Sequence, residues 1–144
     1  MSVEENKAIA RRHLEDTWNA GNLALVDEMF VPGCVFHPPD STTVHHGTDA
    51  LKRGITRFRS AFPDMHIVIE DVCAEGDTVV LRWSGRGTHT GEIVLLQHIP
   101  PTGKQVTWSG MDLYHMAGGK IVEGWRMWDR AVLLQQLGVV PTSG

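Results

Sequence analysis

Hydrophobic positions follow two different periods along the chain, a helical period in its first part and an alternating period in its second part. In the first part, Ala10, Leu14 and Trp18 fall on one helical face and predict a helix from Val3 to about Asn19. Gly21 is placed to end this helix in the left-handed conformation. The chain is therefore expected to begin with a helix that buries one apolar side.

Two more helices are expected before the period changes. The first covers residues 23–30 and precedes a brief extended segment at 34–37. The polar loop 40–46 follows, and Thr48 is expected to cap the next helix. The apolar positions of that helix form one continuous stripe, which a proline ends: Leu51, Ile55, Phe58 and Phe62. This stripe must face a core or a cavity.

In the second part of the chain, stretches rich in β-branched and aromatic residues alternate with turn sequences. Glu75-Gly76-Asp77 and Gly118-Gly119 are turns of the kind that join antiparallel strands. Four strands are expected, at residues 65–74, 78–88, 105–116 and 121–128. Because helices come first and strands afterwards, the order predicts an α+β fold with helices packed on one face of an antiparallel sheet.

The third expected strand is apolar on both of its faces. Trp108 and Tyr114 lie on one side, and Met111 and Leu113 lie on the other. A sheet with one face in water would show polar residues on that face. We therefore expect one face to line the core and a cavity and the other to meet a second subunit, which predicts a homodimer.

Length and charge limit the classes of function. The 144 residues suit a single domain over residues 1–144, which can enclose one cavity. A net charge of −4, without clusters of Lys and Arg, is untypical of proteins that bind nucleic acid or an anionic membrane. No apolar run reaches the roughly 18 residues of a membrane span. With no leader before the first helix, a cytoplasmic protein is expected.

The end of the chain carries its most distinctive motif. A glycine turn leads into a strand with two tryptophans, which ends at an acid and is followed by a short amphipathic helix, over residues 118–138. Together with Ala61-Phe62-Pro63-Asp64 and Pro101-Thr102-Gly103-Lys104, this motif resembles the SnoaL-like polyketide cyclases of the ketosteroid-isomerase-like superfamily. The resemblance covers nearly the whole chain.

The resemblance implies a curved antiparallel sheet that the N-terminal helices close into a cone, usually as a homodimer, with an apolar internal pocket. In the cyclases this pocket holds a polycyclic ester. An aspartate on the last strand acts there as acid and base for an intramolecular aldol closure that uses no metal and no organic cofactor. Because unrelated reactions and pure binding proteins share this fold, the resemblance implies the architecture more specifically than the reaction.

The position of the family's aspartate is occupied differently here. That aspartate directly follows the tryptophan of a Glu-x-Trp motif, so Glu123-Gly124-Trp125 places Arg126 there, and a helper histidine of the family falls at or near Ser109. Two interpretations of Arg126 stay open. It is either solvated or paired with a neighbour such as Glu123 or Asp112, or it points into the pocket. In the pocket it would hold a substrate carboxylate or stabilise an enolate.

Asp129 is the alternative acid. Many relatives carry the Trp-x-x-x-Asp ending seen here from Trp125 to Asp129, which would make Asp129 the functional acid of this branch. An Asp between a strand and a helix is also a good N-cap, and its side chain would then accept a hydrogen bond from an amide near Val132. Both interpretations stay open.

The eight histidines show none of the short spacings that preorganise a metal site, so no metal is expected. His37 is the strongest candidate for a second proton carrier, because it ends the extended segment near the expected pocket mouth and its ordinary pKa suits acid–base work. A purely structural role is its alternative. His89 is placed at a strand end or at the pocket rim.

The tryptophans and the apolar stripe are expected to wall a pocket for a flat, hydrophobic molecule. Asp129, His37 and Arg126 are the predicted catalytic residues. The predicted substrate-binding residues are Trp18, Phe58, Phe62, His89, Ser109, Met111 and Trp128. The expected function is cofactor-independent proton transfer on a small hydrophobic carbonyl compound, as in aldol cyclisation, lyase or isomerase chemistry. A non-catalytic ligand-binding or scaffold domain is the alternative.

Overall fold

The computed structural model describes residues 2–39, 43–94 and 98–139. The predicted first helix is confirmed in two parts, α1 (Val3–Arg12) and a π-helical continuation, η1 (His13–Asn19). Ser2 caps α1 with its side chain, and Glu5 reaches back to the amide of Ser2, so that a capping box starts the helix. A short helix, α2 (Ala24–Met29), follows where residues 23–30 predict one.

The third helix, α3 (Thr48–Ala61), confirms the predicted apolar stripe, since Leu51 and Ile55 are buried on it. Its N-cap differs from the prediction. Gly47, and not Thr48, is the capping residue, and no side-chain hydrogen bond caps this end. The φ of Gly47 is 86°, a value that L-residues rarely adopt, so the chain needs glycine to enter the helix here.

Six strands form one sheet in the order β2-β1-β8-β7-β4-β3. All neighbours are antiparallel except β1 and β8, which run parallel. The four predicted strands are confirmed to within one residue at each end. The strands are β1 (Phe30–His37), β2 (His45–His46), β3 (His66–Glu75), β4 (Thr78–Thr88), β7 (Gln105–Ala117) and β8 (Lys120–Trp128).

Two differences from the predicted sheet concern its start. The extended segment is longer than residues 34–37, because β1 begins at Phe30 and pairs with β8. Part of the predicted polar loop is a strand, because His45–His46 pairs with β1, while residues 40–42 of that loop lie outside the described residues. A separate two-stranded ribbon joins β5 (Ile93–Val94) to β6 (His98–Ile99).

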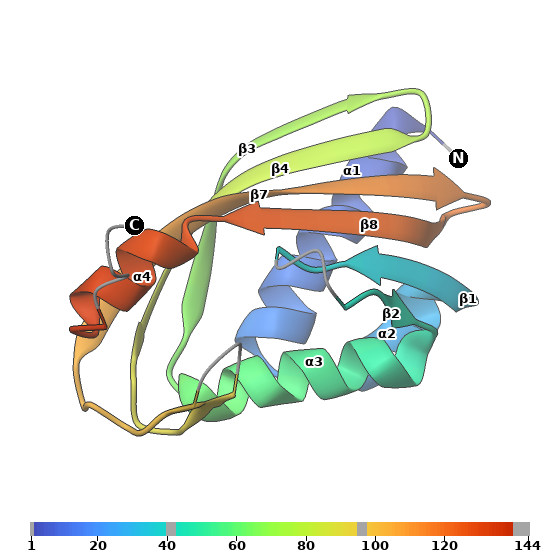
Figure 1. Ribbon diagram of the computed structural model, residues 1–144. Coiled ribbons are helices and arrows are strands. Elements are labelled where there is room, and N and C mark those ends of the chain that lie inside the picture. The colour runs from blue at the N-terminus through green and yellow to red at the C-terminus, as the bar shows by residue number, and fades with distance from the viewer. Residues whose placement is uncertain (1, 40–42, 95–97, 140–144) are drawn as a thin grey trace.

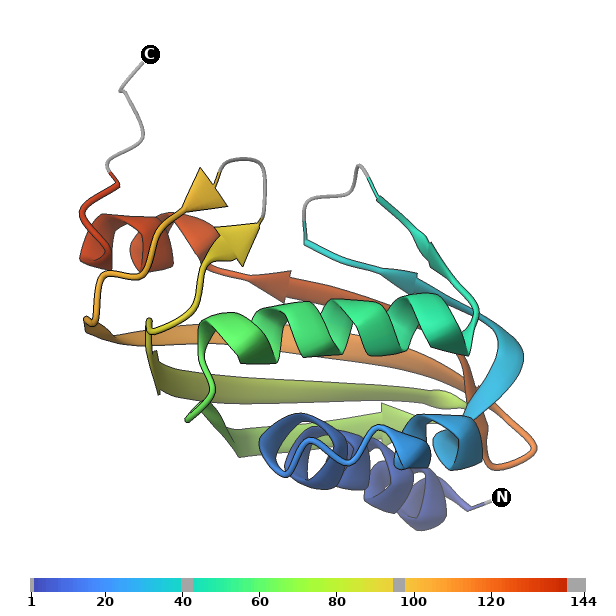
Figure 2. The same cartoon turned by 90° about the horizontal axis from the view of Figure 1, so that it is seen from below.

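The helices lie on one side of the curved sheet, as the α+β prediction requires (Figure 1). Seen from below, α3 lies over the sheet and runs along its long strands, with the N-terminal helices beside it (Figure 2). The last helix, α4 (Arg130–Gln136), is fixed to β7 by Gln136, whose side chain donates to the Thr107 carbonyl (2.6 Å) and accepts from its amide (2.9 Å). Among the described residues, no helix is long and apolar enough to cross a membrane.

The sheet has a buried inner face and an outer face that is partly open. On β7, Trp108, Asp112 and Tyr114 are buried, whereas Met111 is 49% exposed. On β8, Arg126 is buried, whereas Met127 is 66% exposed. Successive side chains of a strand point to opposite faces, so the alternation decides which residues reach the space between sheet and helices.

Candidate functional site

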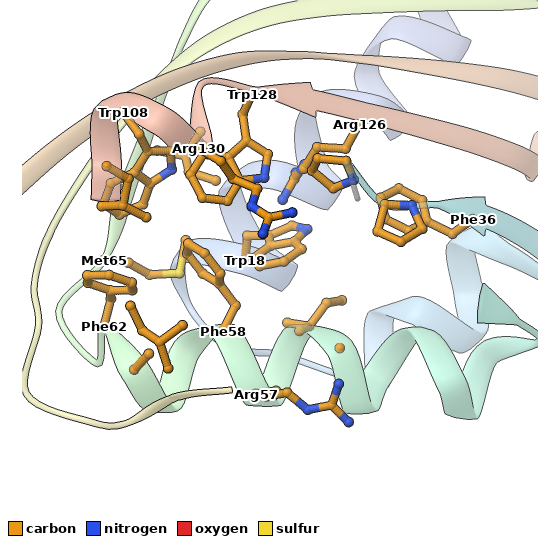
Figure 3. Close-up of a pocket in the computed structure, with 18 of the residues that line it drawn as sticks. Trp18, Phe36, Arg57, Phe58, Phe62, Met65, Trp108, Arg126, Trp128 and Arg130 are labelled. Atoms are coloured by element: carbon orange, nitrogen blue, oxygen red, sulfur yellow. The ribbon is translucent and has the colours of Figure 1, made fainter. Parts of the chain in front are cut away.

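A cavity of about 350 Å³ lies between the inner face of the sheet and helix α3. Aromatic and aliphatic side chains form most of its wall, and four of the chain's five tryptophans belong to it. The labelled rings in Figure 3 converge on this space from the sheet, from η1 and from α3. The aromatic lining residues are Trp18, Phe36, Phe58, Phe62, Trp83, Trp108 and Trp128. Such a cavity accepts a flat, largely apolar molecule.

Trp18 is held in the cavity wall by the contacts of η1. Asn19 imitates a strand neighbour of β3, because its side chain donates to the Ile67 carbonyl (2.8 Å) and accepts from the Ile67 amide (2.7 Å). From α3, Arg59 donates to the carbonyls of Trp18 and Asn19. These contacts join the π-helix to both the sheet and α3, so the position of the indole is fixed from two sides.

The main polar group of the cavity wall is Arg126, which is 7% exposed. It donates to Asp112 twice, through Nε (2.8 Å) and Nη2 (2.8 Å). Asp112 stands directly opposite Arg126, on β7. Its guanidinium also lies over the rings of Trp18 (4.3 Å) and Trp83 (5.0 Å). The two bonds and two ring faces fix the plane of the guanidinium.

Asp112 is fully occupied by its neighbours. Besides Arg126, it accepts hydrogen bonds from Trp83 Nε1 (3.1 Å) and from the Tyr114 hydroxyl (2.6 Å). Burial by itself would raise the pKa of this carboxyl, but the Arg126 charge and the hydrogen bonds outweigh burial and leave the pKa below its usual range. Asp112 is therefore an ionised anchor for Arg126 and a poor proton acceptor.

The same environment acts on two groups beside the pair. Burial, followed by the charge of Asp112, raises the pKa of Tyr114 well above its ordinary value. Burial and the nearby charge of Arg126 lower the pKa of His13 from 6.5 to about 3. His13 is 1% exposed, its ring meets Tyr114 edge-on at 5.9 Å, and its Nδ1 has no partner among the described residues. His13 is neutral at neutral pH.

Two further arginines belong to the cavity lining, Arg130 at the start of α4 and Arg57 on α3. Figure 3 shows Arg130 directed toward Trp18, and Arg57 extending from α3 on the other side. Within the described parts of the chain, neither guanidinium has a hydrogen-bond or ion-pair partner. No Asp or Glu of those parts lines the cavity. The lining is therefore cationic, although the chain carries −4 overall.

His45 lines the cavity and is held there from α3. Its Nδ1 lies 3.0 Å from the Ala50 carbonyl, which can only accept, so Nδ1 carries the hydrogen and Nε2 the lone pair. Gly54 makes room for the ring, because a Cβ on Gly54 would stand 2.6 Å from Cε1 of His45. A glycine in a helix interior costs about 1 kcal/mol relative to alanine, and the close approach of His45 is a physical reason for it.

Five of the ten predicted site residues line the cavity: Trp18, Phe58, Phe62, Arg126 and Trp128. They come from η1, α3, the segment after α3 and β8, so the fold brings together residues far apart in sequence. The interpretation of Arg126 as inward-pointing agrees with its burial, and Asp112 is nevertheless its partner. Any role in binding or chemistry stays a prediction for these residues.

The structure places the two predicted proton carriers outside the cavity lining. Asp129 is exposed and accepts from the amide of Val132 (3.1 Å), so it is the N-cap of α4. His37 hydrogen-bonds Glu123 (2.7 Å) and stacks on Trp125 at 4.8 Å. Asp129 follows the last strand, and its carboxylate caps the first turn of α4. Neither residue belongs to the cavity lining, and their assignment as proton carriers stays a prediction.

The three remaining predicted binding residues also lie off the cavity lining. Ser109 and Met111 occupy odd positions of β7, which face outward, and Ser109 lines a second depression there together with Asp129. His89 is fully buried behind Phe62, with ring centroids 5.5 Å apart, and its Nδ1 contacts the Thr102 hydroxyl (2.9 Å). Strand alternation places Ser109 and Met111 away from this cavity, and burial places His89 behind its wall, so their role in binding stays a prediction.

Sequence reasoning missed His45, Arg57 and Arg130. In the sequence, His45 stands beside His46 without any spacing typical of a site, and its place in the cavity depends on how residues 45–46 fold onto α3. One local feature would have drawn attention to it, the glycine at position 54 in an otherwise regular helix. The two arginines have no distinguishing sequence pattern.

Comparison with known proteins bears on this arrangement. The sequence model of the SnoaL-like polyketide cyclases matches residues 8–137. A candidate SnoaL-like polyketide cyclase from Jannaschia sp. CCS1 has a similar structure, with a TM-score of 0.87 and 23% identity over 96% of this chain and 94% of that one. AclR, a candidate hydroxylase from Streptomyces galilaeus, gives 0.81 and 27% over 99% of this chain and 87% of that one.

A third similar structure, a candidate polyketide cyclase from Bacillus cereus ATCC 10987, has a TM-score of 0.77 and 30% identity, over 95% of this chain and 83% of that one. A comparison with functionally curated proteins finds no match. The names of these structures include more than one reaction, so the likeness describes the fold and family and leaves the chemistry to the residues of the cavity.

Proposed function

The chain belongs to the SnoaL-like polyketide cyclase family, and we propose that it carries out cofactor-independent proton transfer on a small, flat, hydrophobic carbonyl compound held in the central cavity. The observation that carries this proposal is the buried Arg126, oriented by Asp112 in an aromatic wall. A guanidinium fixed before the substrate arrives directs donor hydrogens at an oxygen that becomes negative during the reaction, and these hydrogens stabilise that oxygen.

The bonds of Arg126 define what it offers. Nε and one hydrogen of Nη2 are used by Asp112, while Nη1 has no partner among the described residues. A carbonyl oxygen that accepts from this free edge would be polarised in the ground state and stabilised more strongly as an enolate. The guanidinium cannot release its proton at physiological pH, so another group must move the proton.

His45 is the candidate for that group. Of the described lining residues, it is the one histidine, and an imidazole has one nitrogen that accepts a proton and one that donates. With Nδ1 donating to the Ala50 carbonyl, Nε2 would accept a proton from the carbon next to the substrate carbonyl. The enolate then takes this proton back at another carbon, an isomerisation, or attacks a second carbonyl whose oxygen takes the proton, an aldol closure. Neither route needs a cofactor.

A non-catalytic binding protein is the second candidate, and the position of the carboxylates favours it. Asp129, the alternative family acid, is engaged as a helix cap, and no carboxylate of the described residues lines the cavity. In that case Arg126 holds an anionic or strongly polar ligand and no proton moves. The cavity and its arginine are the same in both candidates, so the difference rests on His45.

The outer face of the sheet supports the proposal of a homodimer. Exposed apolar side chains gather there, among them Val68 (44%), Met111 (49%) and Met127 (66%). An obligate interface over this face would bury roughly 2,000 Å² or more in total. The cavity opens on the other side of the sheet, so each copy would keep its own site.

Hydrogen exchange at carbon distinguishes the two candidates. The probe is 1-tetralone, a bicyclic ketone with exchangeable hydrogens beside its carbonyl, and NMR in D₂O follows deuterium entering that position. An enzyme accelerates the exchange, and His45→Gln slows it about 10²-fold or more. Binding of 1-tetralone without any acceleration by the wild-type protein would favour the binding protein. Failure of 1-tetralone to bind at all would count against the cavity as its site.

A further inference from the structure

We infer that the ligand of the cavity is an amphipathic anion, a flat apolar body carrying a carboxylate or similar acidic group that Arg130 and Arg57 recognise. This inference rests on the proposed function and names the substrate class of the same site. It separates the cationic groups of the cavity into two kinds, one for the reacting oxygen and one for a permanent charge.

The three arginines of the lining differ in whether a carboxylate neutralises their charge. Arg126 is neutralised by Asp112 at 2.8 Å through two bonds, so the pair presents donor hydrogens with little net charge. Arg130 and Arg57 have no such partner among the described residues, and no carboxylate of those residues lines the cavity beside them. The uncompensated positive charge of the lining therefore comes from these two side chains.

The position of Arg130 at the N-terminus of α4 has no explanation in helix stability. It is the first residue of α4, and a cation at the N-terminus of a helix opposes the helix dipole. Helix stability thus gives no reason for an arginine there, whereas the acidic cap Asp129 is placed as the dipole favours. The side chain is half-buried and directed toward Trp18, into the cavity rather than along the helix (Figure 3).

The aromatic walls of the cavity fit the apolar body of such a ligand. Aromatic rings fill most of the lining, and they accept a planar apolar body but offer no counter-charge to a carboxylate. A neutral ester would leave the half-buried Arg130 without a counter-charge, whereas water hydrates the exposed Arg57. A carboxylate would pair with Arg130 inside, with Arg57 at the more exposed edge on α3, through charge-assisted hydrogen bonds. The geometry favours an acid over its ester.

The test compares two probes of nearly one shape, 2-naphthoate and methyl 2-naphthoate, by calorimetric titration of the full chain at low and moderate salt. The wild-type protein is expected to bind the acid at least about tenfold more tightly than the ester, as one partly exposed charge-assisted contact would give. The preference should decrease with salt.

The variants Arg130→Gln and Arg57→Gln are expected to lose affinity for 2-naphthoate and to keep their affinity for the ester, with the larger loss at the more buried Arg130. Arg53→Gln is the matched control, since Arg53 is an exposed arginine on α3 outside the lining and should change neither affinity.

Equal affinity of the wild-type protein for acid and ester would overturn this inference and leave the proposed function standing, because the cavity would still bind a flat apolar compound. A preference for the acid that survives in the Arg57→Gln/Arg130→Gln double variant would also overturn it, by assigning the charge to Arg126. Binding of neither probe would contradict the inference and the proposed function together.

Discussion

The two faces of the sheet at β8 have opposite chemistry although their residues alternate along the same strand. On the inner face, Arg126 and Asp112 are buried, paired and surrounded by indole rings. On the outer face, Glu123 of β8 contacts His37 of the neighbouring strand β1 at 2.7 Å, and their side chains are 36% and 30% exposed. The inner pair is buried and joined by two hydrogen bonds, whereas the outer pair is partly exposed and joined by one.

This difference shows what a buried arginine requires at position 126 of β8. By the resemblance of Glu123-Gly124-Trp125, Arg126 stands where the family's aspartate is expected, and its charge would be costly on a buried strand without a partner. Asp112, directly across the hairpin, supplies that partner. The carboxylate thus stays in the site but is used to hold the arginine. The outer pair has no comparable neighbours and remains near water.

The largest expected effect comes from breaking the inner pair. Asp112→Leu leaves a buried guanidinium without a counter-charge and should lower the free energy of unfolding by about 3 to 5 kcal/mol. The double variant Asp112→Leu/Arg126→Met should recover part of this loss, because no charge is left unpaired. Urea denaturation of each variant measures both values. His37→Gln on the outer face should cost less than about 1 kcal/mol, and equal losses on the two faces would contradict the comparison.

Acid should destabilise the inner face through His13. Its folded pKa of about 3 lies below its ordinary 6.5, so the unfolded chain binds more protons between these two values. Stability from this residue is complete above pH 6.5 and is lost as the pH falls toward 3, at up to about 1.4 kcal/mol per pH unit. The depressed pKa of Asp112 acts in the same direction at lower pH. His13→Leu should flatten the unfolding free energy between pH 6.5 and 4, and an unchanged slope would exclude His13 as its source.

The contact between Gly54 and His45 sharpens the assignment of the proton carrier. Gly54→Ala improves the helix by about 1 kcal/mol of propensity but pushes a methyl group against the imidazole. We expect a folded protein in which exchange of 1-tetralone slows toward the level of His45→Gln. Thermal melting reports the fold and NMR the exchange. Full activity in Gly54→Ala would mean that the position of His45 does not matter for the reaction.

A charged side chain on the outer face of the sheet should weaken the proposed homodimer. Met127 is 66% exposed in the isolated chain, and Met127→Lys should weaken the proposed homodimer about tenfold or more, since a buried charge without a partner would result. Sedimentation or light scattering over a concentration series measures the shift, and Lys120→Gln, a substitution of an exposed residue in the turn region of β8, serves as the control. A wild-type monomer at micromolar concentration would remove the dimer proposal.

The smallest expected effect belongs to Asp129. Asp129→Ala removes the cap of α4 and should cost about 1 kcal/mol of stability, while leaving the exchange of 1-tetralone unchanged. A loss of exchange larger than the change in folded fraction explains would return Asp129 to the catalytic group.

Local pattern predicted the elements but not the cross-strand and helix contacts that build the site. The strand bounds follow from alternation, and the apolar stripe of α3 follows from its helical period, because both depend on neighbours in sequence. The pairing of Arg126 with Asp112 depends on the register of β7 and β8, which a bulge between His115 and Met116 shifts. His45 depends on a loop folding onto α3. Neither contact depends on neighbours in sequence, so the residues alone could not decide between these contacts and their alternatives.

A crystal structure with bound 1-naphthol tests the central claim most directly, because its oxygen stands in for an enolate oxygen on a flat apolar body. The account predicts the rings among Trp18, Phe58 and Trp128, and the oxygen about 2.7 to 3.1 Å from the free edge of Arg126. A naphthol bound instead in the outer depression beside Ser109 and Asp129, or bound in the cavity with its oxygen away from Arg126, would contradict it.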